Sequence, residues 1–210
     1  NIRLPATLIR NGLQAHRWLG LMATLILYVI CLTGTLAVFF EEFERWEQAD
    51  ISEYESFSPA AIKPAMNEYI QRLGRTPEST YIVLPTTGFP RTHITDGVDE
   101  WFLQQDGQFL APVSAPWTSM LKQLHTNLHL PHVIGMTIVG LTGGILLALI
   151  ISGILAHPGI IQDAFVWRKG KSRQLEQTDM HNRLAVWGLP FHIMIAFTGA
   201  FMGLSSLIVG

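Results

Sequence analysis

The sequence predicts an all-α membrane helical bundle of three spans, with a small α+β domain inserted between the first and second spans. Of the 210 residues, 49% are hydrophobic and only 14% are charged, and the mean hydropathy is +0.29. A soluble domain carries about 25% charged residues. Three charge-free stretches, at 18–40, 133–156 and 184–210, are long enough to cross a bilayer. The acidic stretch 41–120 contains no such run.

Residues 1–40 are expected to form an N-terminal arm and the first transmembrane helix. Residues 1–15 have the spacing of a short amphipathic lead-in, and Trp18 to Phe40 is a run of 23 residues without a charge. The acids from Glu41 onward are expected to end the span. No cleavable signal peptide is expected, because the run is longer than the apolar core (h-region) of a signal peptide and lacks a small-residue cleavage site. It should stay as an anchor.

Residues 41–117 are predicted to form the inserted domain. A helix is expected to begin at Ser58-Pro59 and to run to Leu73. Asp106-Gly107 is typical of a hairpin turn between two short apolar runs. Strands are expected at 81–84, 91–95, 101–103 and 109–110. So small a core is only marginally stable alone, so the domain is expected to rest on the membrane part.

The remainder divides into a second transmembrane segment (118–157), a basic loop (158–180) and a third transmembrane segment (181–210). Pro131 is expected to interrupt the helix before the second span, and Pro190 is expected to kink the third. Lys and Arg are in excess in the N-terminal arm and the basic loop. The positive-inside rule places both in the cytoplasm. Residues 41–117 are then periplasmic, and the protein is a multi-pass protein of the bacterial inner membrane.

Histidine is the residue type that stands out. Seven of the eight histidines lie in or beside the apolar stretches. Ionisable side chains are scarce in spans and mark functional sites by default. The simpler interpretations are a headgroup-level position at a helix end, most of all for His132, and an interhelical hydrogen bond. The candidate metal-ligating residues are His16, His125, His129, His157, His181 and His192.

Several of these histidines share one sequence spacing, in which a Thr-Gly pair begins seventeen residues after the histidine. It occurs in His16 with Thr33-Gly34, in His125 with Thr142-Gly143 and in His181 with Thr198-Gly199. The second span is antiparallel to the other two, so its match is the weaker one. The other two predict an internal repeat of the first and third spans.

The donor types favour haem over zinc. Zinc sites usually include Cys, Asp or Glu among their ligands, and of these residue types the spans contain only Cys31. Because Cys31 is the single cysteine of the chain, an intramolecular disulfide is excluded. Haem b needs only axial imidazoles, and two of them leave no open position on the iron, which favours electron transfer. No Gly-x-Gly-x-x-Gly stretch follows a strand, so a nicotinamide or flavin site of that type is not expected.

Depth along the helices predicts two haems, one in each leaflet. At 1.5 Å per residue, His192 is expected about 16 Å from His181, so it is a candidate ligand of either haem. The sequence leaves open which histidines pair on which haem. The cytoplasmic edge would hold His16, His157 and His181, and the outer edge would hold His125, His129 and His132.

Three stretches resemble the PepSY-associated transmembrane proteins, which are iron-regulated inner-membrane proteins with a branch of ferric-siderophore reductases. They are His16-Arg17-Trp18-Leu19-Gly20 with Leu32-Thr33-Gly34, Leu124-His125-Thr126-Asn127-Leu128, and Asp179-Met180-His181-Asn182-Arg183-Leu184 with Leu189-Pro190-Phe191. The resemblance implies histidine-ligated b haems and a periplasmic PepSY-like domain at 41–117. It also implies a fourth span, which this sequence does not contain.

Two functions follow as expectations. In the first, the protein is a haem-containing oxidoreductase that passes single electrons across the membrane to a ferric siderophore and so releases iron. Its electron donor would be a quinol or a cytoplasmic reductase. In the second, it is a non-enzymatic, membrane-anchored PepSY module that binds or inhibits a periplasmic partner, and its histidines are structural. The expected surroundings are the lipid bilayer, and no nucleic-acid partner is expected.

Overall fold

The structure is a computed structural model that describes residues 5–166 and 172–209. The chain forms two compact units. The helical unit comprises Asn1–Gly34 and Gln123–Gly210, and the sheet unit comprises Thr35–Lys122. Residues 167–171 of the predicted basic loop (158–180) lie outside the described residues.

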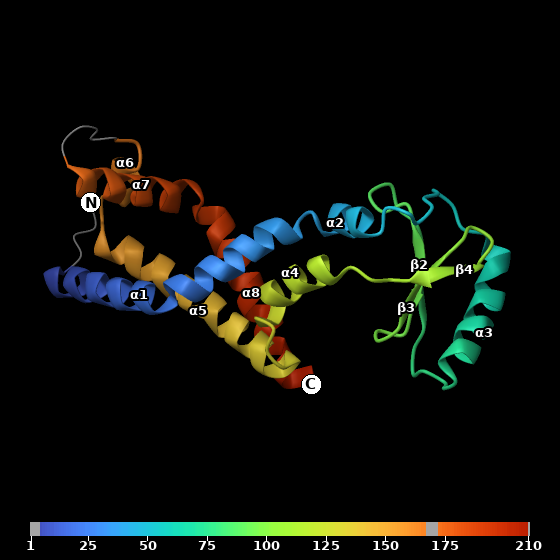
Figure 1. The fold of residues 1–210 in the computed structure, drawn as a ribbon. Helices are drawn as coiled ribbons and strands as arrows, with labels where there is room; N and C mark the ends of the chain where they lie inside the picture. Colours follow the sequence, from blue (N-terminus) through green and yellow to red (C-terminus); the bar gives the residue numbers. More distant parts are fainter. Residues whose placement is uncertain (1–4, 167–171, 210) are drawn as a thin grey trace. The chain divides into compact units, whose positions relative to one another are not determined.

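The helical unit is built from long apolar helices (Figure 1). Its elements are α1 (Ala6–Ala37), the end of α4 (Pro116–Asn127), α5 (His132–Ala156), α6 (Ile160–Asp163), α7 (Arg173–Trp187) and α8 (Leu189–Val209). Two of them, α1 and α5, are each long and apolar enough to cross a membrane, and the bent pair α7 and α8 meets the same criteria only when its two helices are taken together. The described chain therefore has two candidate spans, or three if the bent pair is one span.

The predicted lead-in and the first span form one continuous helix. A single 32-residue helix, α1, runs from Ala6 to Ala37. Its apolar part is continuous with the amphipathic residues before it, because nothing between Ala6 and Trp18 interrupts helical hydrogen bonding and Pro5 stands outside the helix. The helix also ends three residues before Phe40, the predicted end.

The third span is not one helix kinked at Pro190. The chain breaks at Gly188, and α7 and α8 meet at 68°. Pro190 is the second residue of α8, where its missing N–H has no intrahelical acceptor to lose. The proline therefore helps to start a new helix. Residues His181 and His192 consequently lie on two helices with different axes, so the predicted rise of about 16 Å between them does not apply.

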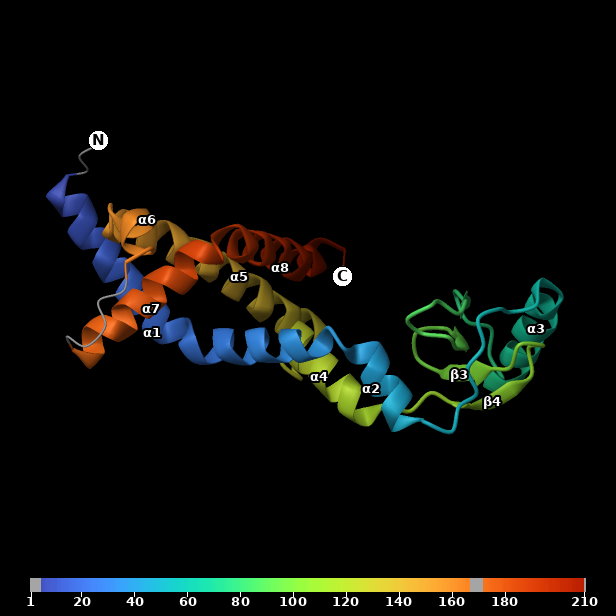
Figure 2. The same ribbon diagram turned by 90° about the horizontal axis from the view of Figure 1, so that it is seen from above.

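Glycines allow the helices of this unit to pack closely. A Cβ added at Gly140 would lie 2.8 Å from the Leu204 nitrogen, and one at Gly143 would lie 2.8 Å from the Ala200 nitrogen. The helices α5 and α8 accordingly lie side by side in both views (Figures 1 and 2). Small residues at such contacts are typical of helix packing in membranes.

The sheet unit contains the predicted helix and strands. They are α2 (Phe40–Glu47), the 3-10 turn η1 (Pro59–Ala61), α3 (Ile62–Leu73), β1 (Tyr81–Val83), β2 (Thr92–Thr95), β3 (Glu100–Leu103) and β4 (Phe109–Pro112). The strands form an antiparallel sheet in the order β1-β2-β3-β4. The predicted Asp-Gly turn joins β3 to β4, with Gly107 at φ 87°, a conformation that glycine adopts without a Cβ penalty.

Both faces of the sheet are covered. Helix α3 packs on one face through Ala65 and Tyr69, against Ile94 and Leu103 (Figure 1). On the other face, Phe102 packs with two residues from loops, Ile51 and Phe89. Neighbouring residues of β3 thus face opposite sides, as strand geometry requires.

Helix α2 lies where the sequence predicts only the end of the first span, because acidic residues follow the apolar run there. Glu41 and Glu42 stand in its first turn and Arg45 in its last, where each charge complements the helix dipole. Its Glu47 accepts hydrogen bonds from the backbone N–H groups of Trp117 and Thr118, at 2.8 and 2.9 Å. This carboxylate therefore caps the first turn of α4.

Replacing Tyr69 by phenylalanine is expected to destabilise the sheet unit by about 1 kcal/mol, because it removes hydrogen bonds to partly buried backbone groups. The Tyr69 hydroxyl donates to the Asp99 carbonyl (2.6 Å) and accepts from the Asp96 N–H (3.0 Å). Thermal unfolding of the detergent-solubilised chain measures the effect. The matched control is Tyr81→Phe, whose ring is exposed. An equal effect of both substitutions would contradict the prediction.

Asp96 is expected to make the sheet unit less stable in acid. The N–H groups of Asp99 and Val98, with the Arg75 guanidinium, hold the pKa of this carboxyl well below its usual range. An unfolded aspartate titrates near pH 3.9. A depressed folded pKa therefore stabilises the fold above about pH 4, and this stabilisation is lost as the pH falls further.

The measurement is the difference in unfolding midpoint between the unmodified chain and Asp96→Asn, from pH 7 to pH 3. The difference should be largest near neutrality and should shrink toward pH 3. Glu55→Gln, at an exposed position, is the control. A difference that stays constant over this range would contradict the assignment.

Candidate functional site

His16 of α1 is held against α5. Its Nδ1 lies 2.9 Å from the Leu149 carbonyl oxygen and 3.3 Å from Ser152 Oγ. A carbonyl oxygen only accepts, so Nδ1 carries the proton and donates it. A Cβ added at Gly153 would lie 3.1 Å from Cε1 of this ring. The absence of a side chain at Gly153 therefore lets the imidazole approach the backbone of α5.

His125 of α4 is held against α1 in the same way. Its Nδ1 donates to the Ile30 carbonyl oxygen at 2.9 Å. A Cβ added at Gly34 would lie 2.5 Å from Cε1 of the ring, closer than any stable contact. Thr33, buried beside this glycine, directs its hydroxyl back to the carbonyls of Val29 and Ile30, at 2.7 and 3.2 Å.

The two histidine contacts share one local arrangement on the receiving helix. An accepting carbonyl at position i is followed by a hydroxyl side chain at i+3 and a glycine at i+4. The hydroxyl also bonds to the accepting carbonyl, at 3.2 Å in both cases. The two sets are Ile30, Thr33 and Gly34, and Leu149, Ser152 and Gly153. Both leave Nε2 of the docked imidazole with its lone pair, and a backbone acceptor on Nδ1 is the usual way in which a metal-ligating histidine is oriented.

His16 also faces His181 of α7. The centroids of the two rings are 6.1 Å apart, with an angle of 67° between their planes. An imidazole nitrogen binds a first-row metal at about 2.0 Å. The ring centroid lies about 1.1 Å beyond that nitrogen, so two imidazoles on opposite sides of one metal have centroids about 6.2 Å apart. The observed separation is close to that value, and it also lies in the range of an ordinary edge-to-face ring contact.

The two docked histidines lie at different levels along α1. His16 and Ile30, the residue that receives His125, are fourteen positions apart. At 1.5 Å per residue this is about 21 Å. The helical unit therefore holds one oriented imidazole near each end of the apolar part of α1.

The remaining predicted site residues have other surroundings. Nε2 of His157 lies 3.1 Å from Asp163 Oδ2. His192, in the first turn of α8, packs on Gly188, where an added Cβ would lie 2.6 Å from its Cε1. His129 follows α4 with a left-handed backbone, φ 56°. Over residues 5–166 and 172–209, no three His, Cys, Asp or Glu side chains gather as ligands of a single metal ion.

The shared spacing predicted a repeat and no contact for these Thr-Gly pairs. Of the three, Thr33-Gly34 receives a histidine ring, that of His125. Thr142-Gly143, the weaker match, contacts α8. The Ser152-Gly153 pair was missed, although a search for Ser-Gly as well as Thr-Gly pairs would have found it. The broken α7–α8 pair also means that the predicted repeat of the first and third spans is not a structural repeat.

Sequence reasoning also missed two buried polar residues on either side of His181. Asp179 is 2% exposed and Asn182 is 7% exposed. Among the described residues, Nδ2 of Asn182 has no hydrogen-bond partner. A buried amide donor without an acceptor is uncommon, so α7 buries polar groups beside His181.

Comparison with known proteins agrees with this architecture. Residues 13–210 match the family described as PepSY-associated TM region. An uncharacterized protein of Pseudomonas aeruginosa is 35% identical over 92 residues, which are 44% of this chain and 23% of that protein. The chain thus covers less than a quarter of the length of this relative.

Proposed function

This chain belongs to the PepSY-associated transmembrane family, and from that premise we propose that it is a haem-containing oxidoreductase of the bacterial inner membrane. It passes single electrons across the bilayer to a ferric siderophore on the periplasmic side. The observation that carries the proposal is the 6.1 Å separation of the His16 and His181 rings. A single metal ion held between the two imidazoles would give a similar separation.

The residues present fit b-type haem. His16, through its Nε2 atom, and His181 would hold the inner haem. His125 would hold the outer haem, and its second ligand would come from the other candidate histidines, His129 and His192. Bound haem supplies reversible one-electron chemistry at iron. The Leu149 and Ile30 carbonyls keep the proton of each docked imidazole on Nδ1, so Nε2 stays a donor atom.

Two levels about 21 Å apart along α1 support a relay from one leaflet to the other. The excess of Lys and Arg in residues 1–17 and in the 158–183 segment supports a cytoplasmic electron entry by the positive-inside rule. The donor is a quinol or a separate reductase. On the periplasmic side, hard oxygen ligands hold Fe(III) more firmly than Fe(II), so one-electron reduction releases iron from its chelate.

The test is the visible spectrum of the detergent-purified protein, before and after dithionite. We expect a Soret band and, on reduction, the sharp alpha band of six-coordinate b haem, with two haems per chain by pyridine haemochrome assay. A preparation from haem-replete cells with no Soret band would overturn the proposal. It would favour the alternative, a membrane-anchored PepSY module whose histidines only join helices.

A further inference from the structure

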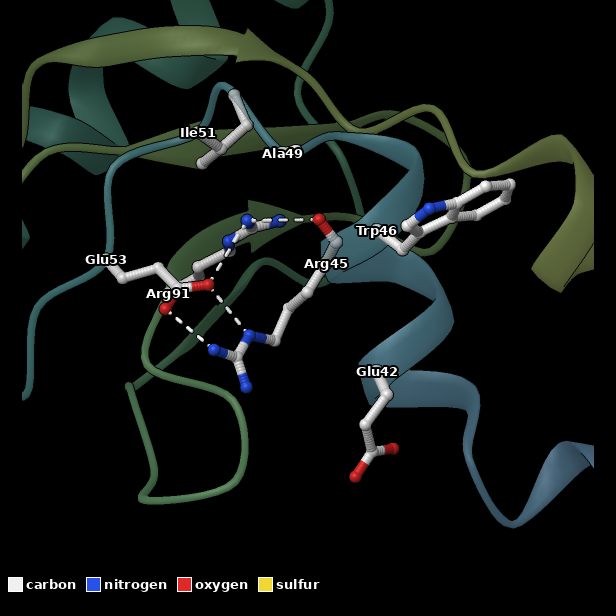
Figure 3. A pocket seen from close by; sticks show the side chains of 7 residues that line it. All are labelled: Glu42, Arg45, Trp46, Ala49, Ile51, Glu53 and Arg91. Atoms are coloured by element: carbon white, nitrogen blue, oxygen red, sulfur yellow. Dashed lines mark hydrogen bonds and ion pairs between the residues drawn. The ribbon is translucent and has the colours of Figure 1, made fainter.

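The sheet unit contains a cavity of about 430 Å³ that the proposed function does not use (Figure 3). It lies between α2 and the loop that follows this helix. Part of its wall is apolar, from Trp46, Ala49 and Ile51. The rest carries charge: Glu42, Arg45, Glu53 and Arg91. Pockets that bind small molecules combine an apolar wall with a few convergent polar groups in this way.

Arg91 is the unusual member of the wall, because it is only 2% exposed. Its Nη2 lies 3.3 Å from Glu53 Oε1 and 3.5 Å from the Arg45 carbonyl oxygen. Its Nε and Nη1 are buried and have no hydrogen-bond partner in the described part of the chain. The guanidinium packs near the rings of Phe89 and Phe102, at 5.9 and 5.7 Å from their centroids. A buried guanidinium is costly unless it is paired, so Arg91 depends on an anionic partner at Nη2, the atom that Glu53 contacts.

Arg45 and Glu53 show which group the cavity accepts. Nε and Nη2 of Arg45 donate to the two carboxylate oxygens of Glu53, at 2.7 and 2.8 Å. Glu53 Oε1 also faces Arg91, so one planar carboxylate bridges two guanidinium groups (Figure 3). Both Arg45 and Glu53 are about one third exposed, and the Glu42 carboxylate points away from them (Figure 3).

We propose that this cavity binds a carboxylate arm of a ferric hydroxycarboxylate chelate, which takes the place of Glu53 between Arg45 and Arg91. The planar, two-oxygen geometry of a carboxylate matches the fork of a guanidinium. Glu53 stands in for this arm in the empty protein and swings out on its exposed loop when the ligand enters. The apolar wall at Trp46 and Ile51 contacts the carbon skeleton of the ligand. That the ligand is a ferric chelate rests on the proposed function, whereas the carboxylate site rests only on the cavity.

The probe is gallium citrate, a redox-inert analogue of ferric citrate, titrated calorimetrically into the detergent-solubilised full chain. Glu53→Gln should bind at least tenfold more tightly, because the competing internal carboxylate is gone. Arg45→Met should bind at least tenfold more weakly, and Arg91→Met should not bind. Arg45→Met is expected to disturb folding less than Arg91→Met, because Arg45 is more exposed. Lys63→Gln removes an exposed positive charge from α3 and should leave the affinity unchanged.

Three results would overturn the carboxylate site, and a fourth would overturn the choice of ligand. The first is an unchanged affinity in both Glu53→Gln and Arg45→Met. The second is an equal loss in Lys63→Gln, which would indicate unspecific charge attraction. The third is inorganic phosphate binding as tightly as citrate, which would assign the site to phosphate. Free citrate binding more tightly than gallium citrate would overturn the chelate as the ligand.

This experiment is independent of haem. Gallium is not reduced, and Arg45, Glu53 and Arg91 all belong to the sheet unit. His16→Ala should therefore leave gallium citrate binding intact. Binding without haem would reject the oxidoreductase and keep the carboxylate site, and haem without binding would do the reverse.

Discussion

Replacing His16 by alanine is expected to remove one of two haems from each chain. His16 is the one histidine whose ring is both oriented by a backbone carbonyl, at 2.9 Å, and placed opposite a second imidazole, at 6.1 Å. Without it the inner haem keeps one axial ligand. The haem content by pyridine haemochrome assay should fall by about half, and the alpha band that remains should be that of the outer haem.

His181→Ala should give the same loss, and the double variant should lose no more than either single one. This non-additivity is the sharpest part of the prediction, because two ligands of one iron act as a unit. If the double variant lost both haems, the two histidines would belong to different sites. His93→Gln is the matched control, since His93 is in the sheet unit, paired with Glu100 at 3.0 Å, and should leave the content unchanged.

Replacing Gly34 by valine is expected to remove the outer haem while leaving the inner one in place. A Cβ alone at this position would lie 2.5 Å from His125 Cε1, and the two methyl groups of valine extend further in the same direction. The imidazole is pushed off α1 and loses the Ile30 carbonyl that orients it. The expected result is loss of about half of the haem, and Gly34→Ala should give a smaller, partial effect.

The control for this variant is Gly144→Val, in the middle of α5. A Cβ at Gly144 would meet nothing within 4 Å, so the same substitution tests helix propensity and hydrophobicity without a histidine contact. Both variants should insert and fold to the same extent by size-exclusion chromatography. Full haem content in Gly34→Val, or equal loss in both variants, would show that His125 does not depend on this glycine.

Much of the sheet unit was predictable from local signals. The Asp106-Gly107 turn, the apolar run at 101–103 and the Ser58-Pro59 helix start all act within a few residues, and the structure confirms them. Helix α2 was not predicted, because acidic residues after an apolar run occur both at the end of a span and in the first turn of a new helix. The choice depends on a tertiary contact, in which Glu47 caps α4 seventy residues further along the chain.

The histidine site divides in the same way. Composition and hydropathy were enough to indicate a membrane protein with histidines at its helix ends, because transfer of residues into a bilayer depends on the residues themselves. Which helix each histidine docks on was not predictable from the sequence. Sequence spacing indicated Thr33-Gly34 only as part of a repeat that begins at His16. That this glycine receives the ring of His125 depends on which helix packs against it.

The sequence alone determined that the chain crosses a membrane, that an α+β unit interrupts its spans, and that histidine is its candidate ligand. Only the tertiary structure decided that α7 and α8 break at Gly188, that His16 faces His181, and that glycine admits each docked imidazole to a helix backbone. The physical reason is the distance along the chain over which each signal acts. Hydropathy, turn chemistry and residue type depend on a few neighbouring positions, whereas a pair of ligands depends on how closely helices that are far apart in the sequence pack together.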